Sequence, residues 1–339
     1  MRRFLLISFI FFCVQANHAQ TKLYYFLTAD RTKVGVKDEF GKVIIPAEFP
    51  NYGFYEGPEL ITSRTIEFYV DKDRELTYDK LNPAMPMGAV YNRQGQFLYN
   101  PQFFDNGPDY WEEGIRRYVE NDKMGFVNKK GEKITLATYG FLYSFNYGYA
   151  KAFKGNMQKK YEKGGEHWYV VAADSNVTSC LINTKGEVVH PLEKKQSDKD
   201  YYYEGKYYPY PFVYSDEEQQ ILNRLNRDIV GISMMYQMSY YQYKYKPLQL
   251  EITERPDEFD PYFVIKAYDE QEGVGIRENL FVDAKTKEPF VIDYEGSDVP
   301  LRQAIIKSLE EFLNFKDRDI LPETRIIAEQ ELKRLKSHP

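Results

Sequence analysis

Two adjacent carboxylates beside an aromatic ring are the residues in this sequence best suited to catalysis. Glu112 and Glu113 directly follow Trp111. A carboxylate pair suits sugar hydrolysis, in which one group protonates the leaving oxygen and the other activates water or attacks the sugar. The pair also directly precedes Gly114, where a turn needs polar residues. We therefore expect a structural turn here, with a carbohydrate-active enzyme as the alternative.

Other catalytic and metal-binding classes lack their usual residues. No His-x-x-x-His pair occurs and no Glu-x-x-His lies in a helical pattern, so zinc hydrolase chemistry lacks its ligands. The acidic run Asp71–Glu75 lacks the glycine and the closing glutamate of a calcium loop. No nucleophile elbow and no phosphate-binding glycine loop is present. Cys180 stands between strand residues, which favours a buried structural thiol. The sequence therefore predicts no cofactor and no metal site.

Aromatic residues offer the other chemistry that the sequence suggests, which is ligand stacking. The chain has 31 Tyr and 23 Phe against two Trp. Exposed rings can stack on sugars or bind partner proteins, whereas buried rings can line a sheet with their hydroxyls at its edge. Both interpretations are open, and burial is the one we favour for most of the rings. The candidate ligand contacts are Trp111, Trp168, Tyr203 and Tyr208.

A hairpin closed by a glycine positions these residues, and its pattern occurs four times. In each copy an apolar strand leads into a short turn that begins with Asn or Asp, and a glycine then precedes a second apolar strand. Lys123–Ile134 is the clearest copy. Glycine at this place supplies the positive φ that short hairpin turns need. The four turn glycines are Gly41, Gly95, Gly131 and Gly186.

A second element lies between the hairpins and combines an aromatic residue, a polar step and a glycine that opens an alternating strand. Gly114 and Gly148 mark two copies, and Gly57 marks a weaker one. With these two elements the sequence resembles the WG-repeat family over about residues 22–195, although three units lack the signature Trp. The resemblance implies a β-repeat domain at 21–195 that binds a ligand.

Helix signals begin where the repeat pattern ends. Ser215 and Glu218 match a capping box, and apolar residues at helical spacing follow them. Four strand-like runs come next. A second helix is expected after these strands, with Ser297 or Asp298 as its cap and Pro300 in its first turn.

The predicted fold is mainly β. An array of about four β-hairpin repeats precedes a smaller α+β domain at 215–321, in which a helix, a four-stranded antiparallel sheet and a second helix follow one another. A linker at 196–214 joins the two parts, and 322–339 forms a C-terminal helix or tail. The intervals between the turn glycines also predict inserted loops near 62–85 and 157–176.

Residues 1–20 have the layout of a secretory signal peptide. Arg2 and Arg3 precede the apolar run Phe4–Val14, and small and polar residues up to Ala19 follow it. The run is shorter than the roughly 20 residues that span a bilayer, and an uncleaved anchor is the alternative. We therefore expect a protein exported to the periplasm or the cell exterior, with no transmembrane segment after cleavage.

The net charge of −6 argues against nucleic acid as a partner, because phosphate backbones are bound by clustered positive charge. We interpret the chain as an exported, non-catalytic binding module for a protein or an envelope polysaccharide. One alternative is a carbohydrate-active enzyme or sugar-binding module that uses Glu112, Glu113 and exposed rings. Another is an inhibitor or chaperone-like C-terminal domain that the repeats display.

Overall fold

The structure is a computed structural model, and it describes part of the chain. The described residues are 21–70, 81–104, 107–165, 167–237, 244–274, 280–314 and 320–337. The expected signal peptide and the acidic run Asp71–Glu75 lie outside these ranges. The chain forms two compact units, one that ends at Thr62 and one that begins at Ser63. The stretch expected to be a linker, 196–214, lies inside the second unit.

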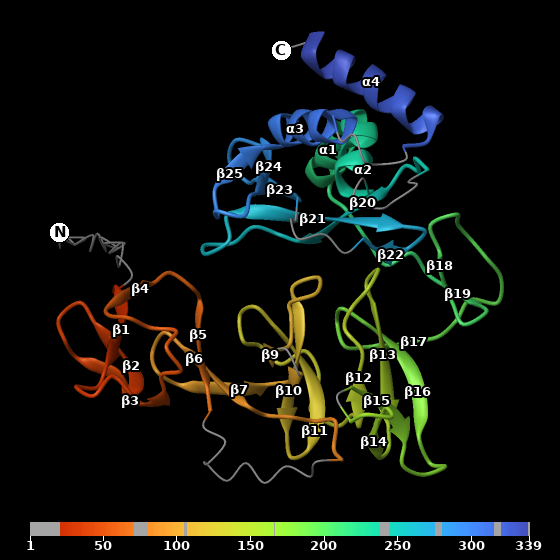
Figure 1. Ribbon diagram of the computed structural model, residues 1–339. Coiled ribbons are helices and arrows are strands. Elements are labelled where there is room, and N and C mark those ends of the chain that lie inside the picture. The colour runs from red at the N-terminus through yellow and green to blue at the C-terminus, as the bar shows by residue number, and fades with distance from the viewer. Residues whose placement is uncertain are drawn as a thin grey trace, which may run out of the picture. The chain divides into compact units, whose positions relative to one another are not determined.

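The first unit contains a four-stranded antiparallel sheet in the order β3-β2-β1-β4 (Figure 1). Its strands are β1 (Leu23–Leu27), β2 (Lys33–Asp38), β3 (Val43–Pro50) and β4 (Glu59–Ile61). Val34 and Val36 of β2 point into its core. At Gly35, between these valines, a β-carbon would lie 2.5 Å from the Ala47 nitrogen, so the close approach of β3 requires glycine.

The repeats continue in the second unit as two antiparallel sheets (Figure 1). The sheet of order β11-β10-β7-β6-β5 consists of β5 (Thr65–Tyr69), β6 (Gly88–Asn92), β7 (Phe97–Pro101), β10 (Ile115–Glu120) and β11 (Lys123–Asn128). The sheet of order β12-β13-β16-β17 consists of β12 (Phe141–Leu142), β13 (Tyr149–Lys154), β16 (Thr178–Asn183) and β17 (Val188–Val189). The mainly β architecture predicted from the sequence is confirmed.

Three two-stranded ribbons accompany these sheets. They are β8 (Phe103–Phe104) with β9 (Gly107–Pro108), β14 (Met157–Tyr161) with β15 (Trp168–Ala172), and β18 (Tyr201–Tyr203) with β19 (Lys206–Tyr208). The ribbon of β14 and β15 occupies the second predicted insertion. That insertion is therefore a hairpin with paired strands rather than a bare loop.

One bend recurs in the four repeat hairpins, as predicted. Its glycines are Gly41, Gly95, Gly131 and Gly186, with φ angles between +77° and +87°. The amide of each glycine donates to the carbonyl of the Asn or Asp three residues earlier, at 2.9–3.1 Å. The side-chain oxygen of that Asn or Asp accepts the amides two and four residues further on. This chemistry is local, because Asp293 and Gly296 form the same bend outside the repeats.

The C-terminal region has an antiparallel sheet of order β20-β21-β23-β24-β25, with β22 paired to β21 (Figure 1). Its strands are β20 (Gln249–Glu254), β21 (Tyr262–Asp269), β22 (Glu272–Gly273), β23 (Leu280–Asp283), β24 (Pro289–Ile292) and β25 (Asp298–Pro300). Its helices are α1 (Asp216–Leu225), the 3-10 helix η1 (Asn226–Asp228), α2 (Ile229–Gln237), α3 (Leu301–Asn314) and α4 (Pro322–Ser337). Apolar side chains from the helices and from one face of the sheet form a single core. Over the described ranges, none of the helices has the length and apolar character of a membrane span.

Two local predictions for this region have different outcomes. The capping box is present, since the Ser215 hydroxyl accepts the Glu218 amide and the Glu218 carboxylate accepts the Ser215 amide. The cap predicted at Ser297 or Asp298 is wrong, because β25 pairs with β24 as far as Pro300 and α3 begins one residue later. With β22 and β25, the sheet has six strands rather than the predicted four.

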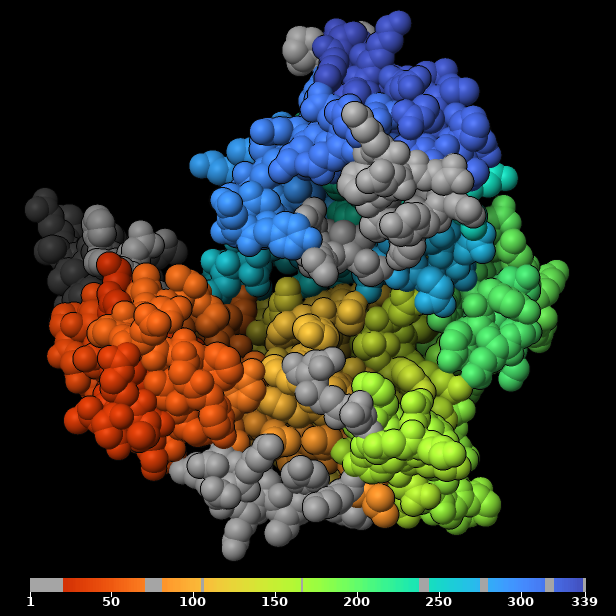
Figure 2. Space-filling model, in the orientation of Figure 1, coloured from red at the N-terminus to blue at the C-terminus, as the bar shows by residue number. Residues whose placement is uncertain are grey.

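The stretch expected to be a linker contains the β18–β19 hairpin, and its tyrosines are core residues. Tyr201 and Tyr208 pack in one cluster with Tyr147 and Tyr149 of the repeats and with Tyr268 of β21. Within this unit the green hairpins therefore lie directly against the cyan and blue C-terminal region (Figure 2). These rings bind the repeats to the second face of the sheet, the face opposite the helices.

Candidate functional site

Two turns of the repeats, 111–115 and 145–149, share one backbone geometry. In each turn the flanking residues bridge, and the two residues between them have positive φ, which is the type I′ hairpin. The φ angles are +56° and +75° in the first turn and +52° and +73° in the second. The first left-handed residue is Glu113 in one turn and Tyr147 in the other, and a glycine follows both.

Glu113 joins both turns to β21. Its carboxylate accepts the Tyr268 hydroxyl at 2.6 Å and the Gly148 amide at 2.8 Å. Burial raises the pKa of the Glu113 carboxyl above its ordinary value, against the opposing effects of the Tyr268 hydrogen bond and of Lys266. Burial, with the carboxylate beside it, also raises the pKa of the Tyr268 phenol well above its usual value. A carboxyl group this enclosed acts as a structural link between the turns and the sheet.

Tyr147 holds the same position in the second turn and is fully buried. Its ring centroid lies 5.6 Å from that of Tyr201 and 5.2 Å from that of Tyr268. Its hydroxyl accepts a hydrogen bond from the Gln249 side chain at 2.7 Å and donates one to the Lys199 carbonyl at 3.2 Å. The second turn therefore contacts the sheet mainly through aromatic packing.

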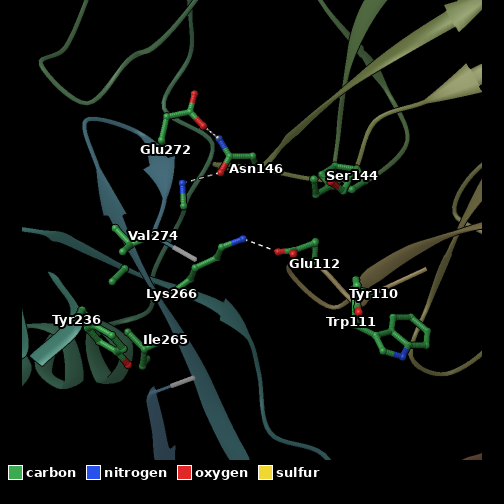
Figure 3. Close-up of a pocket in the computed structure, with 13 residues that line it drawn as sticks. Tyr110, Trp111, Glu112, Ser144, Asn146, Tyr236, Ile265, Lys266, Glu272 and Val274 are labelled. Carbon is green, nitrogen blue, oxygen red and sulfur yellow. Dashed lines mark hydrogen bonds and ion pairs between the residues drawn. The ribbon is translucent and has the colours of Figure 1, made fainter. Parts of the chain in front are cut away.

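The residues that precede these left-handed positions face a cleft (Figure 3). Glu112 and Lys266 point toward each other from the first turn and from β21, and pair at 2.6 Å. Asn146 accepts the Gly273 amide at 2.9 Å and donates to the Gln271 carbonyl at 3.0 Å. The polar groups of the cleft are thus already ordered by contacts between the repeats and the sheet.

The cleft has an aromatic rim and an apolar floor, and its volume is about 420 Å³. Tyr110 on the rim is 74% exposed. Trp111 also lines it, although its indole points away from the central ion pair and lies 4.4 Å from the Arg116 guanidinium (Figure 3). Phe145 contributes to the floor, and Glu272 adds a second carboxylate to the wall. The volume falls in the range of small-ligand sites, roughly 300–1,000 Å³.

Residues 124–157 match the family model described as the WG containing repeat. The chain is similar to the WG family over this segment, which is called the WG repeat below. The matched segment begins in β11, passes through the Gly131 bend and ends at the start of β14. It contributes Asn146 and Tyr147 to the site, so the WG repeat supplies one of the two turns that hold the sheet.

Two other comparisons, with curated proteins and with solved structures, add little to this similarity. A comparison with curated protein sequences gave no match. One solved structure, the crystal structure of a eukaryotic initiation factor, aligns with 82% of this chain and 62% of its own chain at 12% identity, with a TM-score of 0.21. A likeness at that score carries no argument about fold or function.

The turns predicted around the WG repeat have different outcomes. Gly114 and Gly148 occupy equivalent left-handed positions, but the weaker copy at Gly57 lacks that conformation. In the first turn the Ile115 amide donates back to the Glu112 carbonyl. Pro58 follows Gly57 and has no amide hydrogen, so the bond that closes the turn cannot form there.

Of the four candidate ligand contacts, Trp111 lines the cleft and the other three pack against neighbouring side chains. Trp168 stacks on Phe104 with ring centroids 6.0 Å apart, and the Lys159 ammonium lies 4.6 Å from its ring. Tyr203 stacks on Tyr201, and Tyr208 is 9% exposed within the tyrosine cluster. Tyr208 is therefore a core residue, as the favoured interpretation expects, whereas Trp168 and Tyr203 are partly buried against core clusters.

Lys266 and Tyr268 are the site residues that sequence reasoning missed. Their signal is the alternation along β21, where Phe263, Ile265 and Ala267 enter the helix-covered core and the residues between them point to the repeats. This alternation indicates that the second face of β21 is also buried, but it does not indicate that the repeats cover that face. Within the described part of the chain, no cluster of His, Cys, Asp and Glu has a metal-binding arrangement.

Proposed function

We propose that the chain is an exported, non-catalytic binding module whose cleft, between the WG repeat and the C-terminal sheet, binds a protein or an envelope polysaccharide. The composition of the cleft is the observation that carries this proposal. An exposed ring on its rim and polar side chains that converge on the cleft are features of a ligand site. A repeat-containing binding module is also what the WG family suggests.

The contacts of the two acidic residues support a non-catalytic role. A glycosidase needs one carboxyl group to protonate the leaving oxygen and a second one to act on the sugar. Glu112 lines the cleft but pairs with Lys266. Glu113 does not line it and is bound by the Tyr268 hydroxyl and a backbone amide. Only one of the two carboxylates therefore faces the cleft, where a glycosidase would need both.

The rim favours a polysaccharide over a protein as the ligand. The exposed ring of Tyr110 offers a flat surface for the apolar face of a sugar. Glu112 and Glu272 lie in the same cleft, and their carboxylate oxygens can accept hydrogen bonds from sugar hydroxyls. This arrangement suits a neutral or amine-bearing glycan.

A binding assay with matched tyrosine variants tests the cleft. Tyr110→Ala removes a rim residue that is 74% exposed, whereas Tyr294→Ala removes a tyrosine that is 78% exposed and does not line the cleft. On a glycan array, and in a pull-down from envelope protein, we expect Tyr110→Ala to weaken binding about tenfold, as loss of one stacking ring does. Equal binding by both variants would exclude the cleft.

A hydrolysis screen against envelope polysaccharides tests the enzymatic alternative. Glu112→Gln and Glu113→Gln keep the side-chain volume and remove the charge. Turnover by the wild-type protein that both variants abolish, with unchanged unfolding midpoints, would establish an enzyme and reject the non-catalytic proposal. We expect no turnover in any of the three proteins.

Export is tested separately, by the mass of the protein recovered outside the cytoplasm. The signal-peptide layout predicts cleavage close to Ala19. Intact-mass analysis should therefore give a chain that begins near residue 20. A mass that still includes Arg2 and Arg3 would contradict cleavage and favour the uncleaved anchor.

A further inference from the structure

A second hollow lies in the C-terminal region, between α1 and the β23–β24 hairpin. Its volume is about 330 Å³, and small-molecule sites begin at roughly 300 Å³. Ile221 and Leu225 of α1 and Val282 of β23 form its floor, and they are between 1% and 6% exposed. The floor is part of the helix–sheet core, so its shape is held by packed side chains.

The described rim of this hollow has three basic side chains and one acidic side chain, Glu217. Arg224 pairs with Glu288 at 2.7 Å, and Lys287 pairs with Glu217 at 2.7 Å. Arg227 also lines the rim and forms no ion pair with any residue that the structure describes. One positive charge is therefore left over at the mouth of an apolar hollow, on a chain whose net charge is −6.

The rim cations can exchange their partners for a ligand. The carboxylates that pair with them, Glu217 and Glu288, are 59% and 67% exposed at the side chain. Exposed ion pairs of this kind are weak. A ligand anion whose tail is also bound by the floor can therefore displace them.

The backbone conformation at Lys287 fixes where this rim cation is attached before any ligand binds. Lys287 has a φ of +62°, which is unfavourable for a residue with a β-carbon. Its amide donates to the Asp283 carbonyl at 3.0 Å, and Arg224 donates to the Lys287 carbonyl at 2.8 Å. This left-handed turn therefore fixes the position from which the Lys287 side chain leaves the hairpin.

We propose that this hollow binds a small amphipathic anion, an aliphatic carboxylate of the fatty-acid type. The tail lies on the apolar floor, and the carboxylate binds at Arg227 and Lys287. The small concave volume favours such a molecule over an acidic peptide, which would need an extended groove. The site is independent of the cleft between the repeats and the sheet.

Titration of the whole protein with three molecules that share one tail tests the head-group requirement. Decanoate carries a carboxylate, decanol is neutral, and decyltrimethylammonium is a cation. Calorimetry should show saturable binding of decanoate, weaker binding of decanol and none of the cation. Equal binding of decanoate and decanol, or no binding of decanoate, would overturn the proposal, as would binding of an acidic peptide with none of decanoate.

Charge-removing variants locate the site. Lys287→Gly suits the left-handed backbone, and it removes the ammonium together with its contacts to Glu217 and to the Ala284 carbonyl. Arg227→Ala removes the other head-group partner. Each should weaken decanoate binding about fivefold, the upper value for one partly exposed ion pair. Lys285→Ala removes the same charge in the same turn but outside the rim, and it should leave affinity unchanged. Equal affinity in all four proteins would place the ligand elsewhere and reject the assignment.

Discussion

The turn at 111–115 and the turn at 145–149 have the same backbone and differ in the side chain at its first left-handed position. The hydrogen bonds that close them measure 2.9 and 3.1 Å in the first turn and 2.8 and 3.1 Å in the second. Glu113 occupies that position in one turn and Tyr147 in the other. Both side chains are buried against β21.

The difference shows that the repeat backbone and the contact it makes are separate properties. The backbone only directs a side chain toward the sheet. Glu113 then forms two hydrogen bonds, which order the junction but carry the cost of burying a carboxyl group. Tyr147 buries a whole ring among other rings, which contributes stability through area and packing. We therefore expect the WG repeat turn to carry more of the stability of the junction than the turn before it.

Truncation of Tyr147 should have the largest effect. Tyr147→Ala removes a fully buried ring, and a buried aromatic cut back to alanine costs about 3–5 kcal/mol of unfolding free energy. Tyr147→Phe keeps the ring and loses both hydrogen bonds of the hydroxyl, with Gln249 and with Lys199, which should cost about 1–3 kcal/mol. Urea denaturation of both variants measures the two costs. Equal destabilisation by both would show that the hydroxyl, and not the ring, holds this turn.

The glycines of the two turns provide a second comparison, with a third glycine as the control. Gly205 has a φ of +78° and open space around it, so Gly205→Ala should cost about 1 kcal/mol from backbone strain alone. At Gly114 a β-carbon would lie 3.1 Å from the Glu254 side chain, which can move. At Gly148 it would lie 2.6 Å from the ring of Pro211, which cannot move freely.

Gly148→Ala should therefore be the most destabilising of the three, by a further 1–3 kcal/mol or so, the usual cost of overpacking. Gly114→Ala should cost slightly more than Gly205→Ala. Thermal unfolding of the three variants ranks them directly. If Gly114→Ala is the worst, the first turn is the more tightly packed one and the comparison reverses.

The parts of this fold that were predictable from the sequence depend on local chemistry. The bend at Asn128 and Gly131 is specified by an Asn side chain and a glycine three residues apart, so its pattern can be read directly. The failure at Gly57 was equally local, because Pro58 removes one donor. The effect of Pro58 can be recognised only once it is known that the turn closes through the amide that follows its glycine.

The site itself depends on contacts between distant residues. Glu112 and Lys266 are 154 residues apart, and no spacing rule joins them. Strand β25 shows the same limit, since Asp298 carries a good cap signal and pairing with β24 overrides it. The α+β domain was predicted as a unit, but the burial of its second sheet face against the repeats was not.

The pH dependence of the unfolding free energy distinguishes the turn at 111–115, which contains the ionisable Glu113, from the turn at 145–149, which contains Tyr147. The pKa of Glu113 is raised by burial above its ordinary value of 4.5, so the folded state holds this proton more tightly than the unfolded state. Its contribution is fully present below pH 4.5 and is lost as pH rises through the folded pKa. Tyr268, Lys266, Glu112 and the Gly148 amide face this group.

Glu113→Gln stays uncharged, so its stability relative to the wild type should improve as pH rises from 4.5 toward neutrality. Urea denaturation at several pH values measures this difference. Glu329→Gln, at an exposed carboxylate on α4 that pairs with no cation among the described residues, provides the control. A pH-independent difference for Glu113→Gln would mean that the carboxyl group is ionised in both states over this range.

The smallest expected change in unfolding free energy involves Glu112 and Asn146, the residues just before Glu113 and Tyr147. The Lys266 and Glu112 side chains are 19% and 39% exposed, and a double-mutant cycle with Glu112→Gln and Lys266→Met should give a coupling of about 0.2–1 kcal/mol. Asn146→Ala removes three hydrogen bonds to residues 271–273 and should cost more, about 1–3 kcal/mol. A coupling above about 3 kcal/mol would instead match a desolvated ion pair. The cleft would then be closed to water at its centre, and a polar ligand would have to break this pair before it could bind.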